Sequence, residues 1–370
     1  MLKQEVASLS ARVAFLESQK RDLELANQDL SERLADLERT SGRTDMCHRE
    51  LQKDFVELRD KLFKAYDEKN NSFVKSVLAS GFKMMFHTRF SKLSFEALYQ
   101  VLLPIDRYNS EKLCMRKQLL LPLIKLVHDF PHQDLAFRFG ISPATSSLIF
   151  RSWVSIFNDR LYKRIVRSPN RDCNKATLPM LYREHFSDLT EIIDCYETQV
   201  QKPHSLKDQV ALYSSYKGRD TVKGLAAATG HGVLTFMSPL FCGRKSDKHI
   251  VLQSGYLDHI QRGDLVLADR GFLIEEEMAI RGAKLVTPAF MKNQKQFHAK
   301  TTDATRRTAN SRIHIERFIG SLRNRFKVMK GPIPIKYLYC YDDSGLTLYD
   351  KIVRVYSILN NLSPSIVSSD

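Results

Sequence analysis

The sequence predicts an α/β protein in three parts: an N-terminal coiled coil, an all-α domain, and a C-terminal domain built on a mixed sheet. Three observations lead to this prediction. Leucine recurs every seven residues near the N-terminus, helical patterns dominate from Phe86 to Leu161, and strand-like runs appear from Glu191 onward. The chain has 370 residues and is 43% hydrophobic, so it can bury a sizeable core in two or three units.

The charge balance points to a polyanionic partner. The 57 Lys and Arg exceed the 42 Asp and Glu, which gives a formal charge of +15. A chain this basic usually meets nucleic acid or an anionic membrane surface. No run of about 18 apolar residues occurs, and the charged N-terminus lacks a signal-peptide core, so we expect an intracellular protein without a spanning helix. Six scattered cysteines without a CxxC pair indicate reduced thiols.

Residues 1–41 carry the pattern of a leucine zipper. Leucine occupies positions 2, 9, 16, 23, 30 and 37, and the residues between them alternate at spacings of four and three. Leucine at d, valine at a and a single Asn27 at a are typical of a parallel two-stranded coiled coil, in which Asn27 fixes the register. We therefore expect a homodimer, although a long helix packed on its own chain is the alternative. Residues 42–85 are expected to form a helical linker.

A helix-turn-helix domain is expected over residues 86–165. Asp134–Phe139 suits a short helix, Gly140 suits the turn, and Ser142-Pro143 suits the start of a second helix. The residues expected to face inward are Leu148, Ile149, Trp153 and Ile156. The outward face, where a recognition helix contacts the major groove, consists of Ala144, Ser146, Ser147 and Arg151. A three-helix spacer would fit the same pattern.

The segment 188–365 reads as a mixed α/β domain. Strand-like runs cover residues 191–200, 221–230 and 232–240, with a hairpin turn at Gly230–Gly232 between the last two. Further along, the pattern predicts a helix over residues 246–260 and two more strand-like runs over 264–272 and 283–290. A long helix over residues 302–330 is expected to close the domain.

Three acids in this domain are candidate metal ligands. Asp194 lies in the middle of an apolar run, where a buried carboxylate needs a partner. Asp269 ends a second apolar run, and Glu316 lies beside a helical apolar stripe. Convergent carboxylates suit Mg²⁺ or Mn²⁺, and two ions about 4 Å apart support in-line displacement at phosphorus. Each acid also has an ordinary interpretation: a backbone hydrogen bond, a turn, or an ion pair with a neighbouring arginine.

The residues around Glu316 are strongly basic. From Lys284 to Lys330 there are 12 Lys and Arg against Asp303 and Glu316 alone. Such a surface matches a phosphate backbone, whose binding gains from counterion release. The candidate backbone contacts are Arg270, Lys292, Arg312, Arg317 and Arg323.

These motifs occur together in one known family. The stretches "IIDCYE", "YSSYKGRDTVKGL", "GRKSDKHI", "GDLVLADRGF" and "IHIERFIG" resemble the DDE-type transposase-derived endonucleases of the Harbinger-like superfamily. The similarity runs from about Ile192 to Leu362, and "QDLAFRFGISPATSSLIFRSWV" looks like the helix-turn-helix that precedes the nuclease in that family.

The resemblance implies an RNase H-like fold and metal-dependent cleavage and transfer of DNA strands. The family's catalytic acids fall on Asp194, Asp269 and Glu316, which would bind two divalent ions, Mg²⁺ or Mn²⁺. Asp247 in "SDKHI" matches a further motif acid, which we interpret as a neighbour of the ligands.

The N-terminus departs from the family pattern. Many similar proteins carry a zinc-binding THAP finger there, and this chain has a leucine zipper instead. Our leading hypothesis is a nuclear, dimeric DDE nuclease or transposase acting on double-stranded DNA, with no membrane partner. The alternatives are a recruited, non-catalytic DNA-binding regulator and an RNA-directed nuclease.

Overall fold

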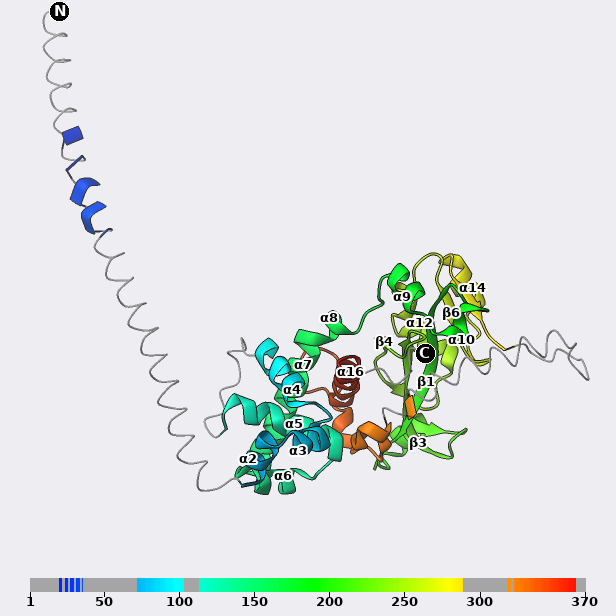
Figure 1. Ribbon diagram of the computed structural model, residues 1–370, viewed down its shortest axis with the longest axis horizontal. Coiled ribbons are helices and arrows are strands. Elements are labelled where there is room, and N and C mark those ends of the chain that lie inside the picture. The colour runs from blue at the N-terminus through cyan, green and yellow to red at the C-terminus, as the bar shows by residue number, and fades with distance from the viewer. Residues whose placement is uncertain are drawn as a thin grey trace, which may run out of the picture. The chain divides into compact units, whose positions relative to one another are not determined.

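The computed structural model describes residues 72–102, 113–288, 319–320 and 323–363, together with short helical pieces between residues 20 and 35 (Figure 1). The chain divides into two compact units, Met1–Asn70 and Asn71–Asp370. In the first unit the described residues are helical and exposed, with an ion pair between Arg33 and Asp29 at 3.0 Å. All six heptad leucines lie outside the described residues, so the coiled coil stays a prediction.

The second unit begins with helices that surround α5 (Met115–His128). The side chains of α5 are buried almost all round, as expected for a helix at the centre of a domain. Val74, Val77 and Met84 are buried in the same core, so residues 72–85 belong to this domain and not to the predicted linker. The helices α3 (Gly81–Thr88), α6 (His132–Phe139) and α7 (Pro143–Phe157) pack against α5, whereas α2 (Ser72–Ala79) packs on α3 and α6, and α4 (Lys92–Leu102) packs on α3.

The predicted turn between α6 and α7 is present in atomic detail. Gly140 ends α6 with φ at +66°, a conformation that costs glycine little. Ser142 caps α7 because its Oγ accepts the N–H of Thr145 at 3.1 Å, and Pro143 occupies the first helical position. A π-helical turn η1 (Asn158–Tyr162) and the short α8 (Lys163–Ile165) follow.

The rotation of α7 about its axis differs from the prediction. Ile149, Trp153 and Ile156 face the core as expected, but Leu148 is 55% exposed and Ser146 is fully buried. The buried stripe follows a spacing of three and four residues from Ser146 through Ile149 and Phe150 to Trp153. Leu148 falls outside that stripe, so both predicted orientations, Leu148 inward and Ser146 outward, are wrong.

The sheet of the C-terminal domain is built around β1 (Leu189–Gln199), which is hydrogen-bonded to a strand on each side. It pairs antiparallel with β3 and parallel with β6, and β6 pairs parallel with β7. The strand order is β2-β3-β1-β6-β7, with β4 and β5 also paired to β3, and this mixed sheet is consistent with an RNase H-like domain. The other strands are β2 (Tyr213–Ser214), β3 (Arg219–Ala228), β4 (Leu234–Met237), β5 (Phe241–Cys242), β6 (Leu265–Leu267) and β7 (Lys284–Val286).

Each face of the sheet carries its own apolar core. Ile192 and Tyr196 on β1 join the larger core, which extends into the helices before the sheet, whereas Ile193 joins a second core on the opposite face. The second core is covered by α12 (Asp247–Gln253), α13 (Tyr256–His259) and α14 (Glu275–Ile280). The remaining short helices are α9 (Arg171–Thr177), α10 (Met180–Arg183) and α11 (Leu206–Leu212).

The C-terminal helix α16 (Leu348–Asn361) joins the helical domain to the sheet, and the sequence analysis missed it. A capping box between Thr347 and Asp350 starts the helix, and nearly all of its side chains are buried. It packs against α7 and η1 and also against β4 (Figure 1). The predicted helix 302–330 is shorter at its end, because its helical residues stop at Arg325 and a 3₁₀ turn covers Lys327–Lys330. No helix in the described part of the chain is long and apolar enough to cross a bilayer.

Candidate active site

Two of the predicted acids occupy matching positions on adjacent parallel strands. The register pairs Ile192 of β1 with Leu267 of β6. Asp194 and Asp269 each lie two residues beyond that pair, so they sit at the same level of the sheet. Because side chains alternate along a strand, Asp194 shares the face of Ile192. The topology therefore brings the two acids of "IIDCYE" and "LADRGF" together, as expected from the sequence.

The two carboxylates are also held in the same way. Asp194 Oδ1 accepts the N–H of Cys195 at 2.8 Å, and Asp269 Oδ1 accepts the N–H of Arg270 at 2.6 Å. Both acids are partly exposed. The expectation that Asp194 is a buried carboxylate is therefore wrong.

The third predicted acid, Glu316, lies outside the described residues. The described segment that follows it packs on the face of β1 that carries Asp194, where Ile319 and Phe326 are buried in the larger core. Arg323 donates from Nη2 to the carbonyl oxygen of Glu197 on β1 at 2.8 Å. Arg323, predicted to contact DNA, is thus engaged in docking its own segment against the sheet.

Behind the two acids, Asp247 forms an ion pair with Lys223. Lys223 Nζ lies 2.6 Å from Asp247 Oδ1, with the two side chains 17% and 25% exposed. Burial lowers the pKa of Lys223, but the hydrogen bond and the charge of Asp247 outweigh it and leave that pKa above its ordinary value. Burial and the same carboxylate raise the pKa of the neighbouring Cys195 thiol, which therefore stays protonated.

Asp247 also touches the loop that carries Asp269. A Cβ placed on Gly271 would lie 2.7 Å from Asp247 Oδ2, so a larger residue here would force the Asp247 carboxylate or the loop to shift. Phe272, buried in the second core, anchors the far end of the loop and donates its N–H to the Asp269 carbonyl at 3.1 Å. Asp247 thus contacts β3 through Lys223 and the Asp269 loop at Gly271, and its role beside the predicted ligands stays a prediction.

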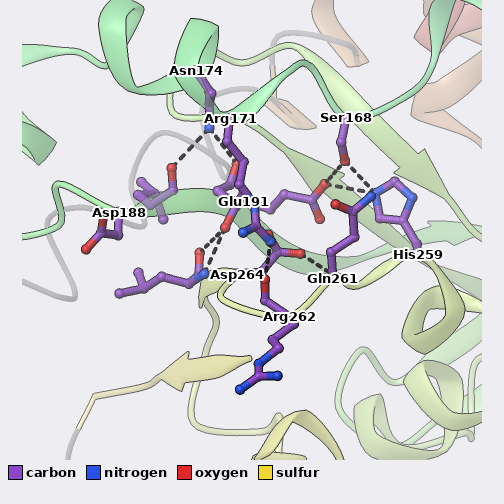
Figure 2. Close-up of polar contacts among 12 residues, drawn as sticks. Ser168, Arg171, Asn174, Asp188, Glu191, His259, Gln261, Arg262 and Asp264 are labelled. Atoms are coloured by element: carbon purple, nitrogen blue, oxygen red, sulfur yellow. Dashed lines mark hydrogen bonds and ion pairs between the residues drawn. The ribbon is translucent and has the colours of Figure 1, made fainter. Parts of the chain in front are cut away.

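The buried carboxylate of β1 is Glu191, a residue that the sequence analysis did not single out. Its side chain is 3% exposed. It accepts hydrogen bonds from His259 Nε2 at 2.8 Å and Ser168 Oγ at 2.7 Å (Figure 2), and from Tyr256 OH at 3.1 Å. Burial raises the pKa of Glu191, but the hydrogen bonds from His259 and Ser168 outweigh it and hold that pKa below its ordinary value. The acid at position 191 in "LTEIID" was the available signal.

The contacts around Glu191 fasten the segment that leads from the helical domain into the sheet. Arg171 donates to Asp264 Oδ1 at 2.8 Å, and Asn174 donates to the carbonyl oxygen of Leu189 at 3.0 Å (Figure 2). Asp264 precedes β6, whereas Asp269 follows it. This cluster therefore lies at the opposite end of the strands from the two acids, and its role is structural.

The predicted DNA contacts on α7 are only partly available. Ser146 is buried with its Oγ 3.1 Å from His132 Nδ1, so it cannot read a base. Ser147 is half-buried, and Arg151 lies over the ring of Tyr341 at 4.8 Å. Arg270 is exposed beside Asp269. The other predicted contacts lie outside the described residues: Lys292, Arg312 and Arg317.

The metal-binding set is incomplete in the described part of the chain. Among those residues no three His, Cys, Asp or Glu side chains gather as ligands. The two aligned carboxylates nevertheless offer the hard oxygen donors that Mg²⁺ or Mn²⁺ prefers. The donor chemistry of Asp194 and Asp269 fits such an ion.

Comparison with known protein families agrees with this geometry. Residues 193–361 match the family model of the DDE superfamily endonuclease, and residues 111–163 match that of the helix-turn-helix of DDE superfamily endonuclease. The first match contains both aligned acids, and the second contains α6 and α7. Comparisons with curated proteins and with solved structures give no match. The chain therefore belongs to the DDE superfamily endonucleases and carries their transposase-type helix-turn-helix ahead of the nuclease domain.

Proposed function

We propose that this protein is a divalent-metal-dependent DDE endonuclease that cleaves and joins DNA phosphodiesters on an RNase H-like domain. The observation that supports the proposal best is the matching placement of Asp194 and Asp269, two residues beyond the Ile192–Leu267 pair on adjacent parallel strands. Acids aligned in this way face one reacting group from two strands. Their partial exposure leaves them open to a DNA backbone.

Asp194, Asp269 and Glu316 would hold two divalent ions, Mg²⁺ or Mn²⁺. Glu316 precedes the buried Ile319 by three residues and Arg323 by seven, a spacing that puts all three on one face of a helix. Because Arg323 bonds to β1, that face would point at the strand that carries Asp194. When bound, the ions would activate a water or a 3′-hydroxyl and stabilise the leaving oxygen.

The chain's own residues would orient the substrate around this site. Arg270, exposed and next to Asp269, is placed to hold a backbone phosphate near the acids. The helix-turn-helix would dock on duplex DNA with the exposed side of α7, where Ala144 and Ser147 are accessible to different degrees. Dimerisation through residues 1–41 would hold two DNA ends together, and a protein with a DNA substrate would act in the nucleus.

Nicking of a supercoiled plasmid tests the proposal. The purified protein is incubated with Mg²⁺, Mn²⁺ or Ca²⁺ beside Asp194→Asn, Asp269→Asn and Glu316→Gln. Asp258→Asn is the matched control, since that side chain is 86% exposed on α13. We expect nicking with Mg²⁺ and Mn²⁺, at least 100-fold slower in each of the three acid variants because each removes one metal ligand, and unchanged in the control.

The outcomes separate the candidate functions. Nicking that survives Asp194→Asn or Asp269→Asn would refute the proposed site. Inactivity of the wild-type protein on plasmids and on its cognate DNA ends, together with intact duplex binding, would favour the recruited regulator. The helix-turn-helix match supports DNA binding in either case.

A further inference from the structure

A basic cleft lies beyond the carboxyl end of β1, separate from the two acids. Its volume is about 600 Å³, within the range of sites that hold ligands. Gln199 and Val200 form its floor at the end of β1, and α11, β2 and the turn into β3 form its walls. The cations that line it are Lys202, Arg219 and Arg244.

The charge of the cleft is unbalanced. Asp220 is the only acid among the residues that line it. Within the described part of the chain, none of Lys202, Arg219 and Arg244 forms an ion pair, and Arg219 donates to the neutral Gln199 Oε1 at 3.0 Å. The segments 199–220 and 241–245 together contain six Lys and Arg against two Asp. Uncompensated cations around a concave surface favour an anionic ligand.

The cleft also offers surfaces for nucleobases. The ring of Tyr213 is 48% exposed and lines the cleft, and Tyr216 on the adjoining turn is 86% exposed. Exposed aromatic rings beside a cationic groove are the features with which proteins bind single strands, because every base has a face that stacks. The amide side chains of Gln199 and Gln209 in the lining add hydrogen-bonding groups without charge.

The position of the cleft relates it to the acids. Gln199 lies five residues beyond Asp194 on the same strand, about 16 Å along it at the usual rise of a strand. Because that spacing is odd, the side chain of Gln199 is on the face of β1 opposite Asp194. The cleft and the loop that follows β6 with Asp269 lie at the same end of the parallel strands.

We propose that this cleft binds the backbone of a single DNA strand at the carboxyl end of β1, beyond the two acids. Lys202, Arg219 and Arg244 would contact consecutive phosphates, and Tyr213 would stack on a base. The inference rests on the proposed function for its choice of DNA, but strand binding needs no cleavage. It assigns the cleft a task distinct from that of the helix-turn-helix, which docks on duplex.

The test measures binding of a fluorescein-labelled oligothymidine by anisotropy in EDTA over a range of salt concentrations. All proteins carry Asp194→Asn, so cleavage cannot contribute. We compare Arg219→Ala/Arg244→Ala with a control that removes the same charge at the opposite end of the strands, Arg167→Ala/Arg262→Ala, where both side chains are exposed. Lys202→Ala is measured as well, because it leaves the Arg219–Gln199 hydrogen bond in place.

We expect Arg219→Ala/Arg244→Ala to bind the oligonucleotide about tenfold more weakly per cation removed. The slope of log K against log salt should fall by roughly 0.7 per lost phosphate contact. Lys202→Ala removes one cation in place of two, so it should lose about half as much binding free energy as the double variant. The control should bind like the parent protein. Equal losses in the cleft variants and in the control would overturn the inference, as would competition by thymidine monophosphate as strong as by the oligomer.

Failure of the proposed nuclease is distinguishable from failure of this inference. If the protein never nicks DNA but the cleft variants bind the strand more weakly, the proposed binding site stands and the proposed nuclease is refuted. If the protein nicks plasmids but all variants bind oligothymidine equally well, the proposed nuclease stands and the proposed binding site is refuted.

Discussion

Replacing Glu191 by glutamine tests whether the buried cluster of β1 stabilises the fold. The carboxylate is 3% exposed, and His259, Ser168 and Tyr256 all donate to it. Glutamine has the same shape but carries an N–H₂ group in place of one oxygen. That group would face the hydroxyl of Tyr256 as a second donor, and His259 would lose the negative charge that keeps it protonated.

The size of the effect follows from these contacts. A hydrogen bond to a charged group contributes about 1.5–3 kcal/mol, and a buried donor without an acceptor costs about 1–3 kcal/mol. Glutamine still accepts from Ser168 and His259 through one oxygen, because both donate to Oε1. The loss therefore falls on the charge of the His259 pair and on the bond from Tyr256. We expect Glu191→Gln to lower the free energy of unfolding by about 2–4 kcal/mol near pH 6.

The pH dependence of this loss has a defined sign. The pKa of Glu191 is lowered from its ordinary 4.5, so its contribution is present above pH 4.5 and is lost as the pH falls through the folded-state value. The pKa of His259 is raised from its ordinary 6.5, so its contribution is complete below pH 6.5 and is lost as the pH rises through the folded-state value. The difference between wild type and variant should therefore be largest between pH 4.5 and 6.5.

Urea unfolding followed by circular dichroism measures the difference at several pH values. Glu184→Gln is the control, because that side chain is 81% exposed. The reasoning is refuted if the two variants lose equal stability at pH 6, or if the loss in Glu191→Gln is the same at pH 6 and pH 9.

Three further changes test other contacts. Gly271→Ala adds a Cβ 2.7 Å from Asp247 Oδ2 and should slow plasmid nicking about 10- to 100-fold by moving the loop of the second acid, with little change in the melting temperature. Asn361→Ala removes an amide that bonds both the N–H and the carbonyl of Leu234, at 2.9 and 2.8 Å, and should cost about 2–3 kcal/mol in urea unfolding. Burial, together with nearby cations, lowers the pKa of His132 from 6.5 to about 4. The contribution of neutral His132 to the free energy of unfolding should therefore be fully present above pH 6.5 and fall by up to about 1.4 kcal/mol per pH unit as the pH drops towards 4. His132→Gln should flatten that fall in acid titrations.

Local sequence signals predicted the fold best at positions where a single residue type determines the backbone conformation. Gly140 needs its positive φ, and Ser142-Pro143 starts a helix by capping and a fixed φ, so the turn of the helix-turn-helix could be located from the sequence. The rotation of α7 could not, because Leu148 and Ile149 are equally apolar and packing against α5 and α16 decides between them. The helix α16 escaped detection for a related reason, since its tyrosines and valines are typical of strands.

The site shows the same division between what alternation determines and what packing determines. Glu191 and Asp194 are three residues apart on β1, so alternation puts them on opposite faces of the sheet. The sequence shows two acids in one apolar run, but it does not show which face of the sheet is covered by other elements. The structure closes the face of Glu191 with Tyr256 and His259 of α13 and leaves Asp194 partly exposed. The cost of burying a carboxylate therefore falls on Glu191, where a histidine and two hydroxyls donate to it, whereas Asp194, the acid aligned with Asp269, stays partly exposed.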